Sequence, residues 1–273
     1  MDRFVTLHGL QTRYREEGQG PAVILLHGAS LGSSLEAFEP NMAPLAARGL
    51  RALALEWPGY GLTPMVPEYS AALRRDHVTR FMDALNVDKA TLVGHSMSGG
   101  VAVQLAFDRP DRVAKVGVLG SGNLLPPLPD KPGREAGVEP TAEPTLEETR
   151  ADLEATTFDH SRLTQELIER RHELSTGVNF EAAKARAALP PERAGGQPLW
   201  QRVEQIPVPA IFIYGKQDRG SAGERAELAR RQFPTLNLHL LDGCKHMVQW
   251  DKADEFVDLL ASFVLEREPA GAR

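Results

Sequence analysis

A serine stands at the centre of the sequence Gly94-His95-Ser96-Met97-Ser98, directly after the apolar residues 91–93. A serine among small residues, at the junction of a strand and a helix, is typical of a nucleophile, because larger neighbours would collide in so tight a turn. The fifth position of the pattern holds Ser98 in place of glycine, and Gly99 and Gly100 follow. The chemistry that this pattern indicates is nucleophilic attack on a carbonyl carbon, with Ser96 as the candidate nucleophile.

A serine hydroxyl is a poor nucleophile at neutral pH and needs a nearby base, which a third group must orient. Two side chains meet this need on loops that follow predicted buried strands. Asp218 comes directly after the apolar run at residues 209–214, and His246 comes shortly after the run at residues 236–241. The order serine, acid, histidine along the chain is that of the α/β-hydrolase fold. We therefore predict a catalytic triad of Ser96, Asp218 and His246.

Other side chains compete for the roles of base, acid and nucleophile. His95 is adjacent to Ser96, but the residue before such a nucleophile usually points away from the base. Glu56 ends a predicted strand that precedes Ser96, which breaks the order of the triad. Cys244 has only Lys245 as a basic neighbour, so we expect a small buried residue there. Surface or structural roles are expected for the other histidines: His8, His77, His160, His172 and His239.

The same chemistry requires backbone amides that stabilise a developing oxyanion. One amide usually belongs to the residue after the nucleophile, here Met97, and a second to the loop after an early buried strand. That loop is His27-Gly28-Ala29, which follows the apolar residues 23–26. We expect Ala29 to provide the second amide. His27 and Gly28 shape the turn in this interpretation, and Gly28 also contacts the substrate.

Strand-like and helix-like segments alternate over the first part of the chain, which predicts parallel strands joined by crossover helices. This alternation stops between residues 123 and 144, where six prolines exclude a core helix or strand. Helical patterns rich in Arg and Glu follow at residues 146–156, 161–174 and 180–188. We therefore predict an α/β core formed by residues 1–123 and 206–273, with residues 124–205 inserted as a helical cap, or lid.

The composition excludes several classes of protein. A net charge of −6 offers no basic surface for nucleic acid. No apolar run reaches the roughly 18 residues of a membrane span. A single cysteine and a start without a signal-peptide pattern predict a cytoplasmic protein. Neither a metal-ligand spacing nor a glycine-rich phosphate loop is present, so we predict no metal and no cofactor. The expected partner is a small-molecule substrate, and the oligomeric state stays open, a homo-oligomer included.

These motifs together resemble the α/β-hydrolase superfamily over nearly the whole chain. Within it, the sequence is most similar to the meta-cleavage product hydrolases, which cut a carbon–carbon bond in vinylogous 1,5-diketones from aromatic-ring degradation. Residues 244–256 are similar to that family's signature around the histidine, through Gln249-Trp250 and Ala253-Asp254-Glu255-Phe256. Residues 163–171 resemble the family's lid helix, whose arginine binds the dienolate or carboxylate end of the substrate. That arginine corresponds to Arg171, and Ser96-Met97 also matches the family elbow.

The resemblance implies an α/β-hydrolase fold, with a mostly parallel sheet of about eight strands and a helical cap. It also implies a reaction in which Arg171 holds the charged end of the substrate while the substrate ketonises and His246 helps to move the proton. Ser96 then attacks the remaining ketone, and water frees the acid. Trp57, Trp200 and Trp250 could line a pocket for an aromatic substrate, although core packing is the more frequent place of a tryptophan.

The sequence departs from the family pattern around the pocket for the acid half of the substrate. The usual oxyanion loop His-Gly-X-Gly-Pro-Gly is here residues 27–32, with Ser30-Leu31 in place of Gly-Pro. An expected asparagine falls near Ala37, His95 replaces the asparagine before the nucleophile, and Met247 replaces a tryptophan. Two alternatives therefore stay open. One is a carboxylesterase or lactonase acting on a small ester, for which Arg171 is only a solvated charge on the cap. The other is a non-catalytic hydrolase-like binding protein, against which the intact triad argues.

Overall fold

The computed structural model describes residues 1–129, 142–189 and 197–266. Within them, eight strands form one sheet: β1 (Asp2–Leu7), β2 (Leu10–Glu17), β3 (Ala22–Leu26), β4 (Arg51–Leu55), β5 (Ala90–His95), β6 (Val113–Leu119), β7 (Ala210–Gly215) and β8 (Asn237–Leu241). Their order is β1-β2-β4-β3-β5-β6-β7-β8. β2 is antiparallel to both β1 and β4, and all other neighbouring strands are parallel. The predicted mostly parallel sheet is thereby confirmed.

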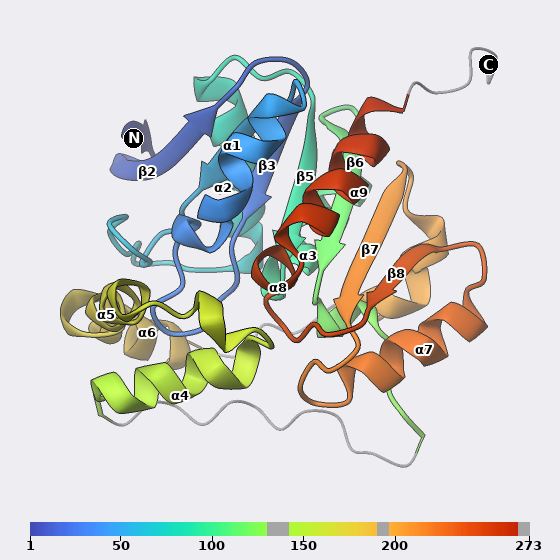
Figure 1. The fold of residues 1–273 in the computed structure, drawn as a ribbon. Coiled ribbons are helices and arrows are strands. Elements are labelled where there is room, and N and C mark those ends of the chain that lie inside the picture. Colours follow the sequence, from blue (N-terminus) through green and yellow to red (C-terminus); the bar gives the residue numbers. More distant parts are fainter. Residues whose placement is uncertain (130–141, 190–196, 267–273) are drawn as a thin grey trace.

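Helices cover both faces of this sheet (Figure 1). On one face, α1 (Glu39–Ala47) packs beside α9 (Ala253–Leu265). On the other face lie α2 (Ala71–Ala84), α3 (Met97–Asp108) and α7 (Ala222–Gln232). The central strand β3 is apolar throughout because both its faces are covered, and its residues 23–26 are fully buried. Burying each such side chain stabilises the fold by about 1.5 to 3 kcal/mol.

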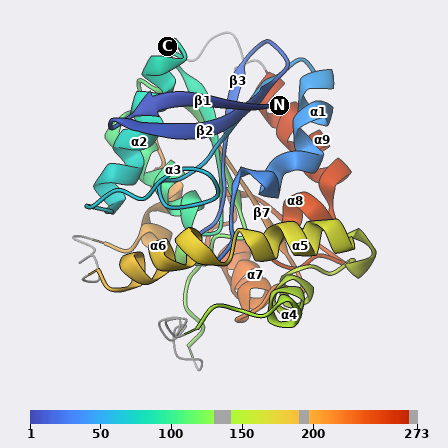
Figure 2. The same cartoon turned by 90° about the vertical axis from the view of Figure 1, so that its left-hand side faces the viewer.

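A further group of helices lies beyond the carboxyl ends of the parallel strands. α4 (Leu146–Thr156), α5 (Gln165–Glu173) and α6 (Gly177–Ala187) come between β6 and β7 in the sequence. Figures 1 and 2 show these helices together below the sheet. Leu153 of α4 and Ile168 of α5 belong to the same buried cluster as α1 and α9. The group therefore packs onto the core, while the predicted cap boundaries at residues 124 and 205 stay a prediction.

Short helices complete the described part of the chain: η1 (Leu35–Phe38), η2 (Gly122–Leu124), η3 (His160–Arg162), η4 (Leu199–Gln205) and α8 (Val248–Asp251). The prediction of one continuous helix at residues 161–174 is wrong, because η3 ends at Arg162 and α5 begins at Gln165. Thr164 between them has extended backbone, and its hydroxyl accepts from the Leu167 N–H at 3.2 Å. A threonine in this position caps the start of a new helix. The helix α7 has no counterpart in the sequence-based prediction.

A buried arginine ties the edge hairpin to the rest of the fold. Arg13 of β2 is 1% exposed, and its guanidinium donates to Glu36 at 2.9 Å and to Glu56 at 3.2 Å. Glu36 also accepts from Arg170 of α5 at 3.2 Å. The network therefore joins the hairpin, the end of β4, the loop before α1 and a helix of the predicted cap. It fixes where α5 sits against the core.

Replacing Arg13 by methionine should lower the free energy of unfolding by about 3 kcal/mol, because removal of one member of a buried ion pair leaves a buried carboxylate uncompensated. That carboxylate is Glu56, which is fully buried. Urea unfolding measures the effect. The matched control is Arg109→Met, since the Arg109 side chain is 42% exposed and its partner Asp111 is 60% exposed, so loss of this pair should leave stability nearly unchanged. Similar small effects in both variants would contradict the assignment.

Candidate active site

Ser96 occupies the turn between β5 and α3. Its backbone has φ +56° and ψ −121°, a combination that non-glycine residues rarely adopt, and such strain is concentrated at functional sites. Backbone hydrogen bonds hold the turn. The Ser96 N–H donates to the Leu119 carbonyl at 2.8 Å, and the Ser96 carbonyl accepts from the Gly99 N–H at 3.1 Å. The hydroxyl of Ser121 also donates to the Ser96 carbonyl. The structure therefore holds Ser96 in a strained elbow at the carboxyl end of a central strand.

Gly94 leaves no room for a side chain beneath this elbow. A Cβ there would lie 2.2 Å from the Ser98 carbonyl oxygen and 2.5 Å from the Gly99 nitrogen. Both are backbone atoms of the turn, so neither can move away unless the elbow opens.

Gly94→Ala should consequently lower the free energy of unfolding by about 2 to 3 kcal/mol, the usual scale of overpacking in a tight core. Chemical denaturation followed by circular dichroism provides the measurement. Gly122→Ala is the matched control, because among the described residues a Cβ there would meet only the Arg225 Nη1 atom, at an ordinary 3.5 Å. If Gly94→Ala were as stable as Gly122→Ala, the backbone of the turn would adjust to a side chain more easily than its geometry indicates.

The predicted base and acid lie on the loops after β8 and β7. His246 Nδ1 is 3.0 Å from Asp218 Oδ2, and Asp218 Oδ1 accepts from the Arg219 backbone N–H at 2.6 Å. A carboxylate only accepts, so Nδ1 carries a proton and donates to it, and in the neutral ring Nε2 then has the lone pair. Among the described residues, neither His246 Nε2 nor the Ser96 hydroxyl has a hydrogen-bond partner. Catalytic hydrogen bonds are often long in the absence of substrate.

His95 is turned toward the base, which makes the prediction that it points away wrong. Its ring lies 4.8 Å from the ring of His246, and its Nε2 donates to the His246 carbonyl at 3.0 Å. Gly28 leaves room for this approach, because the Cβ of any larger residue at position 28 would lie only 3.1 Å from His95 Nδ1. Burial, with His246 alongside, holds the pKa of His95 well below its usual value of 6.5. Asp218 pairs with His246, so His95 lacks the orienting acid that a base needs.

The loop after β3 touches the elbow. A Cβ on Gly28 would lie 3.3 Å from the Cβ of Ser96. The Ala29 carbonyl accepts from the Tyr60 hydroxyl at 3.2 Å, which holds the outer part of the loop. In the part of the chain that the structure describes, the backbone N–H groups of Ala29 and Met97 have no acceptor. Both amides are thus available to a ligand, as the oxyanion prediction requires.

Arg171, in the last turn of α5, lines a cavity of about 430 Å³ with Met247 and Trp250. Burial lowers the pKa of its guanidinium. Among residues 1–129, 142–189 and 197–266, no side chain or backbone group accepts a hydrogen bond from that guanidinium. The neighbouring Arg170, by contrast, pairs with Glu36 and Glu173, each at 3.2 Å. The contrast identifies Arg171 as a cation without a hydrogen-bonded partner among the described residues, next to the loop that carries His246. Asp152 and Glu36 attract it only at longer range.

The three tryptophans differ in their surroundings. Trp57 is fully buried, and its indole donates to the His27 carbonyl at 3.0 Å, so it belongs to the core and not to a pocket. Trp200 is partly exposed on η4. Trp250 borders the Arg171 cavity and donates to the Ala37 carbonyl at 2.8 Å. Of the three, Trp250 therefore fits the predicted place beside a substrate.

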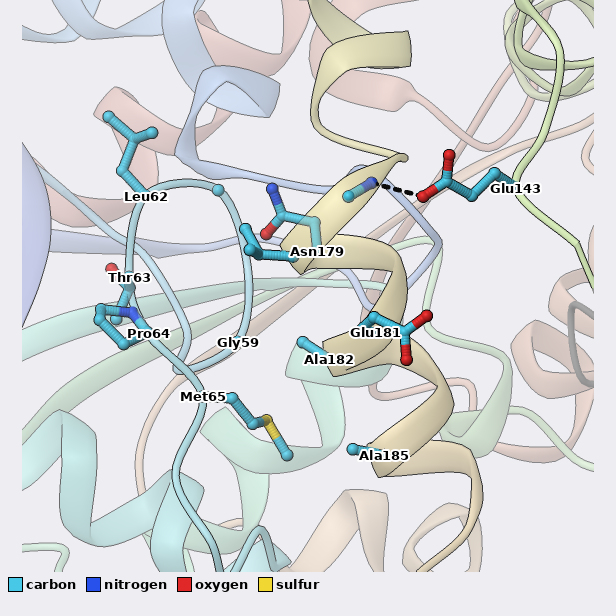
Figure 3. A pocket seen from close by; sticks show the side chains of 13 residues that line it. Gly59, Leu62, Thr63, Pro64, Met65, Glu143, Asn179, Glu181, Ala182 and Ala185 are labelled. Atoms are coloured by element: carbon cyan, nitrogen blue, oxygen red, sulfur yellow. Dashed lines mark hydrogen bonds between the residues drawn. The ribbon is translucent and has the colours of Figure 1, made fainter.

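A second cavity of about 900 Å³ lies between the loop after β4 and the first turns of α6 (Figure 3). Figure 3 shows Met65 of that loop facing Ala182 and Ala185 of α6. At its rim, Glu143 accepts from the Gly177 N–H at 2.7 Å. None of the predicted site residues lines this cavity, so we do not include it in the candidate active site.

An indirect link from α6 through the loop after β4 to the oxyanion loop is absent from the sequence-based prediction. Arg186 of α6 stacks over the ring of Tyr60, 3.8 Å from its centroid, and donates to the Gly59 carbonyl. Tyr60 in turn bonds to the Ala29 carbonyl. The available signal was the Pro- and Gly-rich loop at residues 57–61, which predicts a turn but not what the turn contacts. A helix of the predicted cap thus contacts the loop after β4, which in turn bonds to the loop that carries the Ala29 amide.

Two further observations concern ligands and membranes. Over the described residues, no three His, Cys, Asp or Glu side chains are grouped closely enough to hold a metal ion. No helix there combines the length and the apolar character that crossing a membrane requires.

Burial raises the pKa of the Cys244 thiol, which is fully buried, so its thiolate form is disfavoured.

Comparison with known proteins defines the class of protein. The model of the alpha/beta hydrolase family matches residues 23–259. The chain therefore belongs to the alpha/beta hydrolase family, and it is an enzyme, a hydrolase. This finding confirms the predicted fold class and argues against the alternative of a non-catalytic binding protein.

Individual proteins of similar sequence and structure indicate which kind of alpha/beta hydrolase the chain resembles. The chain is 29% identical over 266 residues to 2-hydroxy-6-oxo-6-phenylhexa-2,4-dienoate hydrolase of Comamonas testosteroni, covering 93% of this chain and 91% of the relative. It is 30% identical over 265 residues to 2-hydroxy-6-oxononadienedioate/2-hydroxy-6-oxononatrienedioate hydrolase 1 of Dechloromonas aromatica (strain RCB), with the same coverage. Among solved structures, a variant of CumD, a meta-cleavage product hydrolase of Pseudomonas fluorescens IP01, superimposes with a TM-score of 0.77 at 26% identity, over 94% of this chain and 95% of that chain. The predicted resemblance to meta-cleavage product hydrolases is confirmed.

Proposed function

We propose that this enzyme hydrolyses the carbon–carbon bond of an acidic vinylogous diketone, a meta-cleavage product of aromatic-ring degradation, to give two acids. The observation that carries this proposal is Arg171, whose guanidinium has no acceptor in the described part of the chain and borders a cavity with Met247 and Trp250. The names of both curated relatives support it, since a dienoate and a dienedioate each carry a carboxylate. A simple ester substrate would not need this cation.

The first role in the proposal is recognition of the acid end. A partly buried guanidinium gains more from a carboxylate than from water, and it can form two parallel hydrogen bonds with it. Arg171 holds the carboxylate or dienolate end while the substrate ketonises, and His246 helps to move the proton. The Gly28 backbone and the Trp250 ring contact the bound substrate on either side in this proposal.

Ser96 then attacks the remaining ketone. His246 accepts the serine proton at Nε2, and Asp218, 3.0 Å from Nδ1, stabilises the imidazolium that results. The amides of Met97 and Ala29 donate to the oxyanion. The carbon–carbon bond breaks with its electrons passing into the leaving fragment as a dienolate, which takes the proton from His246. Water, which gives a proton to His246, then attacks the acyl group on Ser96 and releases the second acid. A cytoplasmic location and a small-molecule substrate as partner complete the proposal, and a homo-oligomer stays open.

A panel assay tests the proposal directly. The purified enzyme is offered yellow ring-cleavage products beside short neutral esters, and the loss of visible absorbance is followed. We expect fast bleaching of the acidic dienoates and slow hydrolysis of the esters. Hydrolysis of esters or lactones without any bleaching would instead favour the carboxylesterase or lactonase alternative.

A further inference from the structure

His27 is the first residue of the oxyanion loop, and both of its ring nitrogens are hydrogen-bonded. Nδ1 is 2.8 Å from the carbonyl oxygen of Gly28, and Nε2 is 3.1 Å from the backbone nitrogen of Trp57. A carbonyl oxygen only accepts and a backbone N–H only donates. Nδ1 therefore carries the proton, and Nε2 accepts with its lone pair. The hydrogen bonds thus define one tautomer.

The surroundings of His27 also define its charge. The side chain is fully buried, and burial lowers its pKa to about 3. A second proton on Nε2 would face the Trp57 N–H, donor against donor. The ring is therefore neutral at neutral pH and acts as a fixed donor at Nδ1.

The carbonyl of Gly28 and the N–H of Ala29 belong to the same peptide group. That group is planar, and its oxygen and its N–H point in opposite directions. Holding the Gly28 oxygen from one side therefore sets the direction of the Ala29 N–H on the other. We propose that His27 is a positioning residue, which aims the Ala29 amide at the oxyanion by donating from Nδ1 to the Gly28 carbonyl. This inference rests on the proposed function, which uses that amide.

Two further contacts keep His27 itself in place. Its own carbonyl accepts from the indole N–H of Trp57 at 3.0 Å and from the hydroxyl of Ser98. Trp57 and Ser98 are both fully buried, so these bonds do not exchange with water. Ser98 stands where the elbow pattern usually has glycine. Its hydrogen bond to the His27 carbonyl, which a glycine could not form, connects α3 to the oxyanion loop.

The arrangement strengthens the amide as well as aiming it. A hydrogen bond to a peptide carbonyl polarises the peptide, which makes its N–H a better donor. Donors that are aligned before the reaction stabilise a developing oxyanion without reorganisation, and loss of one such donor typically lowers kcat by about 10²- to 10³-fold. A donor that is only misaligned loses a part of this effect.

Two isosteric variants separate the donor role from packing. Asparagine at position 27 places its amide nitrogen near the former Nδ1 and still donates to Gly28. Glutamine reaches the former Nε2 position, where its oxygen accepts from Trp57, but it leaves the Gly28 carbonyl without its donor. We expect His27→Gln to lower kcat by about 10- to 100-fold with KM changed less than about twofold, whereas His27→Asn keeps kcat within about threefold.

Equal kcat values in the two variants would overturn the proposal, whether both are impaired or both active, because the Gly28 donor would then not matter. Thermal unfolding shows whether each variant folds. Should one fail to fold, Ser98→Ala serves instead. It removes one of the two donors to the His27 carbonyl and leaves the other, the Trp57 indole, which loses Ser98 as a second acceptor. It should lower kcat about fivefold at unchanged KM, and an unchanged kcat would equally overturn the proposal.

Phenylboronic acid distinguishes this inference from the proposed function itself, because it forms a tetrahedral adduct with a nucleophilic serine. The wild type should bind it, Ser96→Ala should not, and His27→Gln should bind it at least about tenfold more weakly than the wild type. Failure of the wild type to bind would count against Ser96 as the nucleophile. Equal binding by wild type and His27→Gln would overturn the role of His27 alone.

Discussion

Replacing Ser96 by alanine should lower kcat by about 10⁴- to 10⁶-fold on every substrate, because the covalent step loses its nucleophile and no other member of the triad replaces it. The other hydroxyl of the elbow, on Ser98, is fully buried and donates to the His27 carbonyl, so it cannot replace that of Ser96. His246 and Asp218 remain in place in the variant. Substrate binding should persist, since Arg171 and the cavity beside it are untouched. Single-turnover bleaching of an acidic dienoate measures the loss, and equilibrium binding of the same dienoate measures what remains.

Two controls make this result specific to Ser96. Labelling with a fluorophosphonate should disappear in Ser96→Ala and persist in Ser121→Ala, whose hydroxyl donates to the elbow backbone but has no chemical role. Thermal unfolding of both variants should stay close to the wild type. Unchanged turnover in a well-folded Ser96→Ala enzyme would refute the triad.

The sequence predicts the candidate triad because each of its members follows an apolar run. Parallel strands buried on both faces are apolar throughout, and their carboxyl ends meet at one edge of the sheet, where ligands bind. Ser96, Asp218 and His246 each come just after such a run, so their spatial proximity follows from the fold class. The observed hydrogen bond between His246 and Asp218 agrees with this reasoning.

Contacts between side chains from distant segments could not be predicted in the same way. The orientation of His95 depends on the missing side chain of Gly28, 67 positions earlier in the chain, which periodicity does not reveal. The contact of Arg186 with Tyr60 depends on how α6 lies against the loop after β4. Thr164, a common cap residue, indicates the break between η3 and α5. The apolar periodicity on either side of it, however, favours one continuous helix, and the prediction followed that periodicity.

The sequence likewise does not predict that the Arg171 guanidinium has no acceptor in the described part of the chain, because this depends on the packing of α5. Arg170 and Arg171 are equivalent in sequence, each a cation in the last turn of one helix. Helix geometry turns them about 100° apart. Both border the cavity, but Arg170 is paired with Glu36, whereas the Arg171 guanidinium has no acceptor among the described residues. Their different surroundings make the pair a natural comparison for testing what Arg171 does.

Arg171→Gln should therefore reduce kcat/KM for an acidic dienoate by about 10³-fold, or about 4 kcal/mol, the scale on which a desolvated charge pair loses one partner. The same variant should hydrolyse a neutral aryl ester within about threefold of the wild type, because that substrate brings no charge to the cavity. Arg171→Lys should fall between the two, since it keeps the charge but not the planar fork. Steady-state kinetics on both substrates provides the comparison.

Arg170→Gln is the matched control on the same turn of α5. Glu36 keeps its bonds to Arg13 in that variant, so the network survives and both activities should change by less than about threefold. A carboxylate-selective loss in Arg171→Gln alone would mean that the cavity recognises the acid end of a ring-cleavage product. Equal losses on the dienoate and on the ester would mean that Arg171 supports the position of α5 and not the charge of the substrate, and the case for carbon–carbon hydrolysis over ester hydrolysis would then lose its main support.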